Sequence, residues 1–198
     1  MNLKKLFTAA VVVLLLCEVL LILLSWTLSA TMTDGVRSLL SEEGVRWLFG
    51  SYTDMLQSQW LVWLLLLSMA AGCLWGSGLL TELRTFYHSY RIRFALRLTL
   101  VFLLVYVAVI IMLTAVPHAS LLSVTGSLWP SPFSRALIPV LSFGIVLCSM
   151  LFGLVSHHFA TLSDAVFSLC QGIAKAAPLF LLYVLLMQLL SSFRFAIT

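Results

Sequence analysis

The sequence predicts an all-α integral membrane protein with five transmembrane helices and short amphipathic helices at the membrane interface. Of its 198 residues, 62% are hydrophobic and only 9% are charged, and the mean hydropathy is +1.13. Soluble domains have about 45–50% apolar and about 25% charged residues, so this composition places most of the chain in lipid. A span needs about 20 mostly apolar residues, and five stretches qualify: residues 6–29, 60–80, 98–116, 136–155 and 176–190.

The domain organisation follows from the absence of repeats or low-complexity linkers in the sequence. We therefore expect residues 1–198 to form one membrane-embedded helical domain. The alternative is two packed groups of helices, with the first two spans against the last three. The basic segment Glu82–Arg97 would then join the two groups.

The first apolar stretch has features of a signal peptide, because Lys4 and Lys5 precede it. The apolar part of a signal peptide is only about 7–15 residues long and ends at a small-residue cleavage site. Residues 6–29 form a longer apolar run, so we interpret them as a retained span.

The basic residues predict the orientation of the chain in a bacterial cytoplasmic (inner) membrane. With the N-terminus in the cytoplasm and the C-terminus outside, seven basic residues lie inside and four lie outside, as the positive-inside rule requires. Because these charges flank spans, the net charge of +4 does not indicate nucleic-acid binding. The inside residues are Lys4, Lys5, Arg84, Arg91, Arg93, Arg97 and Lys175.

A short amphipathic helix is expected in the first external segment, residues 30–59. Ser41 is a suitable N-cap for a helix that continues to Phe49, because a serine hydroxyl accepts hydrogen bonds from free backbone N–H groups. Helical spacing places three apolar side chains on one face and turns two others elsewhere: Val45, Leu48 and Phe49 on the face, and Trp47 and Arg46 away from it.

The sequence also predicts the structure of two further connections between spans. Residues 117–135 hold three prolines and almost no charge, which favours an irregular cap on the spans. In residues 156–175, Ser163 is a candidate N-cap for a helix that continues into the last span, with Pro178 as a kink.

Glu18 is the sharpest candidate functional residue. It lies near the middle of the first span, where an ionisable group is costly and is usually functional. It is therefore a candidate proton or cation site, or a polar anchor for another protein. The structural alternative is a protonated carboxyl group that is hydrogen-bonded to a neighbouring helix, with Tyr106 or Gln188 as the partner.

The second span carries a track of small residues, Ser68, Gly72 and Gly76, at intervals of four. Such tracks allow the backbones of two helices to approach closely. The track is either a dimer seam or a contact within one subunit.

The sequence offers little support for catalysis. His157 and His158 are adjacent, so a helix would point them in different directions, and with Asp164 they lack a third firm metal ligand. The four cysteines are scattered and read as packing residues. There is no nucleophile elbow, phosphate-binding loop or dinucleotide fingerprint. We therefore predict no enzyme, metal site or cofactor.

Two regions of the chain carry recognisable patterns. Residues 38–80 hold a short motif and then a span rich in small residues, and the motif positions are Leu39, Leu40, Ser41, Glu43, Gly44 and Trp47. The second region extends from about Arg93 to Phe193, with motif positions Pro139, Ser163, Asp164, Pro178 and Gln188. Both regions resemble the p-aminobenzoyl-glutamate transporter family (AbgT).

The resemblance implies the scaffold domain of that family, which dimerises. Family members also have a transport domain with two re-entrant hairpins that hold the polar substrate and sodium motifs. The first hairpin region would fall between Leu80 and Arg93, where this chain has only the basic connector. The second would follow Phe193. Because the two regions that resemble the family do not include either hairpin, no binding residue can be carried over to this sequence.

The sequence therefore predicts a non-enzymatic inner-membrane scaffold or accessory subunit. Its expected partners are membrane lipids and either a second copy of the chain or a polytopic membrane protein. The alternative function is a transporter, or a subunit of one, that moves an organic anion or drug-like solute of the p-aminobenzoyl-glutamate type, coupled to H⁺ or Na⁺. Glu18 would be the coupling residue in that case.

Overall fold

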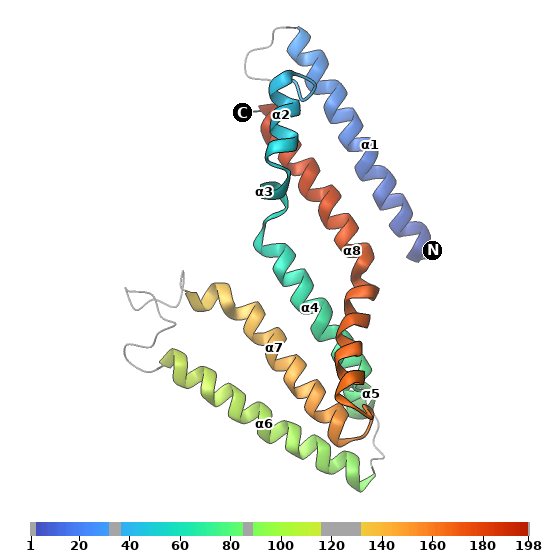
Figure 1. The fold of residues 1–198 in the computed structure, drawn as a ribbon, viewed down its shortest axis with the longest axis vertical. Coiled ribbons are helices and arrows are strands. Elements are labelled where there is room, and N and C mark those ends of the chain that lie inside the picture. The colour runs from blue at the N-terminus through green and yellow to red at the C-terminus, as the bar shows by residue number, and fades with distance from the viewer. Residues whose placement is uncertain (1–2, 32–36, 85–88, 116–131, 198) are drawn as a thin grey trace. The chain divides into compact units, whose positions relative to one another are not determined.

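The computed structural model describes residues 3–31, 37–84, 89–115 and 132–197, and within these ranges the regular elements are all α-helices (Figure 1). The long helices are apolar on every face, as helices in lipid are. The elements are α1 (Leu3–Ala30), α2 (Glu42–Gly50), α3 (Tyr52–Leu56), α4 (Gln59–Gly76), α5 (Leu79–Arg84), α6 (Tyr90–Ala115), α7 (Pro132–Val155) and α8 (Leu162–Ile197).

Five of these helices, α1, α4, α6, α7 and α8, are long and apolar enough to cross a membrane, which confirms the predicted fold class. The third begins at Tyr90 rather than at residue 98, so Arg91, Arg93 and Arg97 of the basic connector lie in this helix instead of a loop. The last is 36 residues long because Pro178 lies inside it without ending it. Proline removes one backbone hydrogen bond, and the rest of a long helix can compensate for that loss.

The contacts divide the chain into two compact units. The first comprises Met1–Val62 and Ala177–Thr198, and the second comprises Trp63–Ala176. Both α4 and α8 contribute residues to each unit, so the division does not follow the predicted boundary between the second and third spans. That the two units form one domain stays a prediction.

In the first unit, the end of α8 is tied to the segment that follows α1. The backbone N–H of Arg37 donates to the carbonyl of Ala196 at 3.0 Å. The hydroxyl of Ser25, on α1, accepts a hydrogen bond from the N–H of Leu39 at 3.3 Å. These bonds satisfy backbone groups that would otherwise be exposed to an apolar environment.

The predicted cap of α2 is confirmed, and the side that packs within the protein is the one that carries Trp47. The hydroxyl of Ser41 accepts from the N–H of Gly44 at 3.1 Å. Trp47, expected to point elsewhere, packs on the ring of Phe195, whereas Phe49 is 81% exposed. Gly44 is buried on α2. A side chain there would collide with the carbonyl of Leu39, so glycine allows the helix to lie close to the preceding segment.

In the second unit, α6 packs along α7, which also contacts α5 (Figure 1). The hydroxyl of Tyr106, on α6, donates to the carbonyl of Val140 at 2.7 Å. Gly144, one turn further along α7, makes room for the tyrosine ring, since a methyl group there would lie 2.7 Å from it. A small core formed by Cys73, Phe159 and Ala165 lies in the same unit.

The helix α8 begins earlier than predicted, and Thr161 rather than Ser163 caps it. The Thr161 hydroxyl accepts from the N–H of Asp164 at 3.4 Å, and the Asp164 carboxylate accepts from the N–H of Thr161 at 2.9 Å. This reciprocal pair is a capping box, and it satisfies two backbone donors at once. Ser163 lies inside the helix because its neighbours already supply both halves of the cap.

The basic connector includes the end of the short helix α5 and the start of α6, and α5 follows a turn at Gly78 with φ of +72°. A positive φ favours glycine because it has no Cβ. Residues 85–88 lie outside the described part of the chain, as does most of the segment predicted to form an irregular cap, residues 117–131.

Candidate functional site

Glu18 lies half-buried on α1 and faces the last turns of α8. The hydroxyl of Ser192 donates a hydrogen bond of 2.8 Å to Oε1 of Glu18. Ser192 is buried, and the other carboxyl oxygen of Glu18, Oε2, is buried and has no hydrogen-bond partner among the described residues. One carboxyl oxygen of Glu18 is therefore left without a hydrogen-bond partner in the described residues, inside a helix long and apolar enough to span a membrane.

The partners expected for Glu18 were Tyr106 and Gln188, and the structure gives Ser192 instead. The Tyr106 hydroxyl donates to the carbonyl of Val140 in the second unit. Gln188 is half-buried and lies on α8 four residues before Ser192. The prediction named the correct helix in Gln188 but placed the contact one turn too early.

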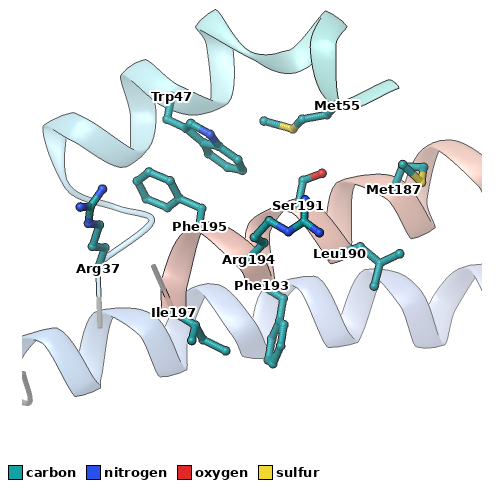
Figure 2. A pocket seen from close by; sticks show the side chains of 10 residues that line it. All are labelled: Arg37, Trp47, Met55, Met187, Leu190, Ser191, Phe193, Arg194, Phe195 and Ile197. Atoms are coloured by element: carbon teal, nitrogen blue, oxygen red, sulfur yellow. The ribbon is translucent and has the colours of Figure 1, made fainter. Parts of the chain in front are cut away.

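A pocket of about 850 Å³ lies in the first unit, between α2, α3 and the end of α8 (Figure 2). Its lining combines aromatic, sulfur-containing and basic side chains. The residues from α2 and α3 are Trp47 and Met55, and those at the end of α8 include Met187, Ser191 and Arg194. Pockets of roughly 300–1,000 Å³ accommodate small molecules, so this size is compatible with a ligand.

Trp47 and Phe195 form one wall of this pocket. Their rings stack with centroids 4.4 Å apart and an interplanar angle of 21°, and Figure 2 shows the two side chains facing each other. Aromatic pairs in this arrangement contribute about 0.5–1.5 kcal/mol beyond the burial of their area. The stack therefore fixes α2 against the end of α8.

Tyr183 holds the junction between α3 and α4. Its hydroxyl donates to the carbonyl of Leu56 at 2.9 Å and lies 2.6 Å from the hydroxyl of Ser58. A phenol has one proton, so Ser58 is the donor in the second bond. The Tyr183 hydroxyl thus satisfies the carbonyl of Leu56 at the point where the chain leaves α3 and enters the second span.

The track of small residues on α4 packs against α8 of the same chain. Ser68 and Gly72 are buried, and the backbones of Gly72 and Gly172 are in contact. A methyl group on Gly72 would lie 2.6 Å from the nitrogen of Gly172, and one on Gly76 would lie 2.8 Å from Cβ of Ser168. The described contact is thus the one within a subunit, and a dimer seam at this track stays a prediction.

The four arginines of the connector have exposed side chains. Arg84 ends α5, and Arg91, Arg93 and Arg97 occupy the first two turns of α6. Lys175, on α8 of the same unit, lies 6.0 Å from the ring centre of Trp75, a distance at which cation–π attraction operates.

The two histidines occupy a turn between α7 and α8. His157 has φ of +63°, and Nδ1 of His158 lies 3.0 Å from the Ser156 hydroxyl. In the described part of the chain, no group of three or more His, Cys, Asp and Glu residues is placed to hold a metal ion.

The comparisons with known proteins agree with this helical arrangement. The sequence matches no protein-family profile and no curated protein. Among solved structures, it is similar to the YdaH transporter of Alcanivorax borkumensis, with a TM-score of 0.76 and 16% identity, over 94% of this chain and 70% of that chain. The chain has an AbgT-type fold. At this identity the similarity establishes the fold and no more.

The AbgT-type fold confirms the resemblance found in residues 38–80 and 93–193. The similarity covers 94% of the chain, which is more than those two regions, so it includes helices for which no motif was noted. The protein is a multi-pass membrane protein with the fold of a transporter.

Sequence reasoning missed the residues that hold the site together. Ser192, Tyr183 and the Trp47–Phe195 stack received no role in the predictions, although each joins distant segments. One signal was available, since Ser191 and Ser192 form a polar pair within a mostly apolar helix. Polar side chains within a span usually have a partner on another helix.

Proposed function

We propose that this protein is a non-enzymatic scaffold or accessory subunit of a membrane transport system. The AbgT-type fold supports a role connected with transport. The observation that carries the choice of a scaffold is the continuity of the helices. The five candidate spans, as far as the structure describes them, are unbroken.

Transporters commonly bind solute near the middle of the membrane, where interrupted helices expose backbone groups. Here α7 and α8 continue past Pro139 and Pro178. Close packing of Gly72 against Gly172 further joins α4 to α8 within the second unit. Such a group of helices is suited to hold a fixed position while another component moves.

The first helix offers the surface for a partner. Its apolar side chains are largely exposed, and Glu18 and Ser25 provide its polar links to the rest of the first unit. The partner is a second copy of this chain or a polytopic membrane protein, which would cover the helix in the membrane.

Purification in a mild detergent tests this proposal. The expected result is a dimer by mass photometry, or a stable complex with one polytopic protein that survives repeated chromatography. Isolated monomers with nothing bound, recovered from membranes cross-linked before solubilisation, would contradict it.

A transporter, or a subunit of one, is the second candidate. Its support is the buried Oε2 of Glu18, which has no hydrogen-bond partner in the described residues. A carboxyl group of this kind can bind and release H⁺ or Na⁺ in step with an organic anion or drug-like solute of the p-aminobenzoyl-glutamate type.

Proteoliposomes distinguish the two functions. If the chain transports, purified protein moves p-aminobenzoyl-glutamate under an imposed proton or sodium gradient, and Glu18→Gln stops the gradient-driven part. Cys17→Ala, on the adjacent residue, is the matched control and should leave the flux unchanged. Absence of flux in every gradient, with correctly inserted protein, would remove this candidate.

We also infer a cytoplasmic N-terminus and an external C-terminus in the inner membrane, from seven basic residues on one side and four on the other. In a cysteine-free background, Ser89→Cys should react with an impermeant thiol reagent only after the cells are permeabilised. Asp54→Cys should react in intact cells. The reverse pattern would invert the topology.

A further inference from the structure

An apolar groove of about 390 Å³ lies in the second unit, along α6 and bounded by α5 and α7. Its walls are almost entirely aliphatic, and one face of α6 supplies much of the lining through residues spaced three and four apart. Representative lining residues are Leu83 of α5, Leu96, Leu100 and Leu103 of α6, and Leu141 and Ile145 of α7.

The groove lies within candidate membrane spans, so its surroundings are lipid. Its walls carry few polar groups, and the Tyr106 hydroxyl in the lining already donates to the carbonyl of Val140. A long apolar chain fits such a lining, because polar solutes would leave their hydrogen bonds unmade there.

Basic side chains flank one end of the groove. Arg84 directly follows Leu83, and Arg93 precedes Leu96 by three residues, which makes it a neighbour on the helix surface. Arg97 is next to Leu96, and all three arginine side chains are exposed. The apolar lining thus begins where the positive charge is concentrated.

The same groove also offers a donor for a second polar group. Ser149 lines it from α7, its side chain is fully buried, and its hydroxyl has no hydrogen-bond partner in the described residues. A buried hydroxyl without a partner is costly, and an ester carbonyl entering the groove would accept its proton.

From these observations we infer that the groove is a binding site for one phospholipid with an anionic headgroup. The phosphate lies against Arg84 and Arg93, an ester carbonyl accepts from Ser149, and one acyl chain occupies the aliphatic lining. Basic pockets beside membrane helices bind anionic lipid headgroups by the same combination of charge and apolar burial. The site is separate from Glu18 and does not depend on whether the protein is a scaffold or a transporter.

Native mass spectrometry of the purified full chain in detergent tests this site. Dioleoyl phosphatidylglycerol and dioleoyl phosphatidylcholine have the same acyl chains and differ in headgroup charge. The wild type should retain one phosphatidylglycerol in preference to phosphatidylcholine. Each arginine near a membrane surface raises the affinity for an anionic lipid roughly fivefold. The double variant Arg84→Gln/Arg93→Gln should therefore reduce the preference for phosphatidylglycerol about 25-fold.

Two matched controls separate a specific site from a general effect. Arg91→Gln removes an arginine from the same turn of α6, on a side turned away from the groove, and should keep the preference. Leu103→Trp should fill the groove and reduce retention of both lipids, whereas Leu104→Trp, on a neighbouring residue that does not line the groove, should not. Equal binding of the two lipids by the wild type, or equal losses in test and control variants, would overturn the inference.

Discussion

The hydroxyl of Ser192 donates a hydrogen bond of 2.8 Å to the carboxyl group of Glu18, which joins the last turns of α8 to the middle of α1. This bond is the polar contact described for Glu18 within the first unit, and it leaves the second carboxyl oxygen buried without a partner. The site is therefore a polar link between two membrane helices in which Oε2 of Glu18 can still accept a hydrogen bond.

Ser192→Ala should destabilise the protein, because it leaves Glu18 without its donor. Interhelical hydrogen bonds in membranes contribute about 0.6–2 kcal/mol, and we expect a loss of that size. The measurement is the free energy of unfolding in mixed micelles. Ser191→Ala removes the adjacent hydroxyl, which lines the pocket instead, and should change stability less; an equal effect of the two variants would contradict the role of the bond.

The stack of Trp47 on Phe195 should appear as an energetic coupling. In a double-mutant cycle with alanine at both positions, we expect a coupling of about 0.5–1.5 kcal/mol, since each ring loses its partner. Phe49 and Phe193 provide the control pair, on the same two helices but with exposed side chains. Their coupling should be near zero, and a similar value in both cycles would argue against the stack.

Gly72→Ala should lower stability although alanine favours helices. The new methyl group would lie 2.5 Å from the carbonyl oxygen of Ser168, a backbone atom that cannot rotate away. Overpacking of this kind costs about 1–3 kcal/mol. Gly50→Ala is the control, because no atom lies within 4 Å of the added methyl group there. Thermal unfolding in detergent should show a lower midpoint for the first variant alone.

Thr161→Ala should weaken the start of α8, since it removes the hydroxyl that accepts from the N–H of Asp164. The loss of an N-cap costs about 0.5–2 kcal/mol. Ser163→Ala tests the position expected from the sequence, and it should have little effect because Ser163 is within the helix. Hydrogen exchange at the first turn of α8 would report the difference, and faster exchange in Ser163→Ala alone would reverse the assignment.

Much of the fold was predictable from the sequence because a span is a local property. In lipid every backbone polar group must be satisfied within the segment, so a sufficiently long apolar run folds as a helix regardless of its neighbours. Local rules also predicted the cap at Ser41. The prediction of a cap at Ser163 was wrong. Thr161 and Asp164, on either side of it, form a reciprocal pair that a rule based on one residue does not detect.

The sequence by itself determined the five apolar helices, the intramembrane Glu18 and the face of α4 on which the small residues lie. Only the tertiary structure decided the partners: Ser192 for Glu18, Gly172 for Gly72, and Phe195 for a tryptophan that was expected to face away. The reason is that helices in lipid are apolar on every face, so the alternation that identifies the packed side of a soluble helix is absent. Which face packs then depends on close fit and hydrogen bonds between segments that are distant in the sequence.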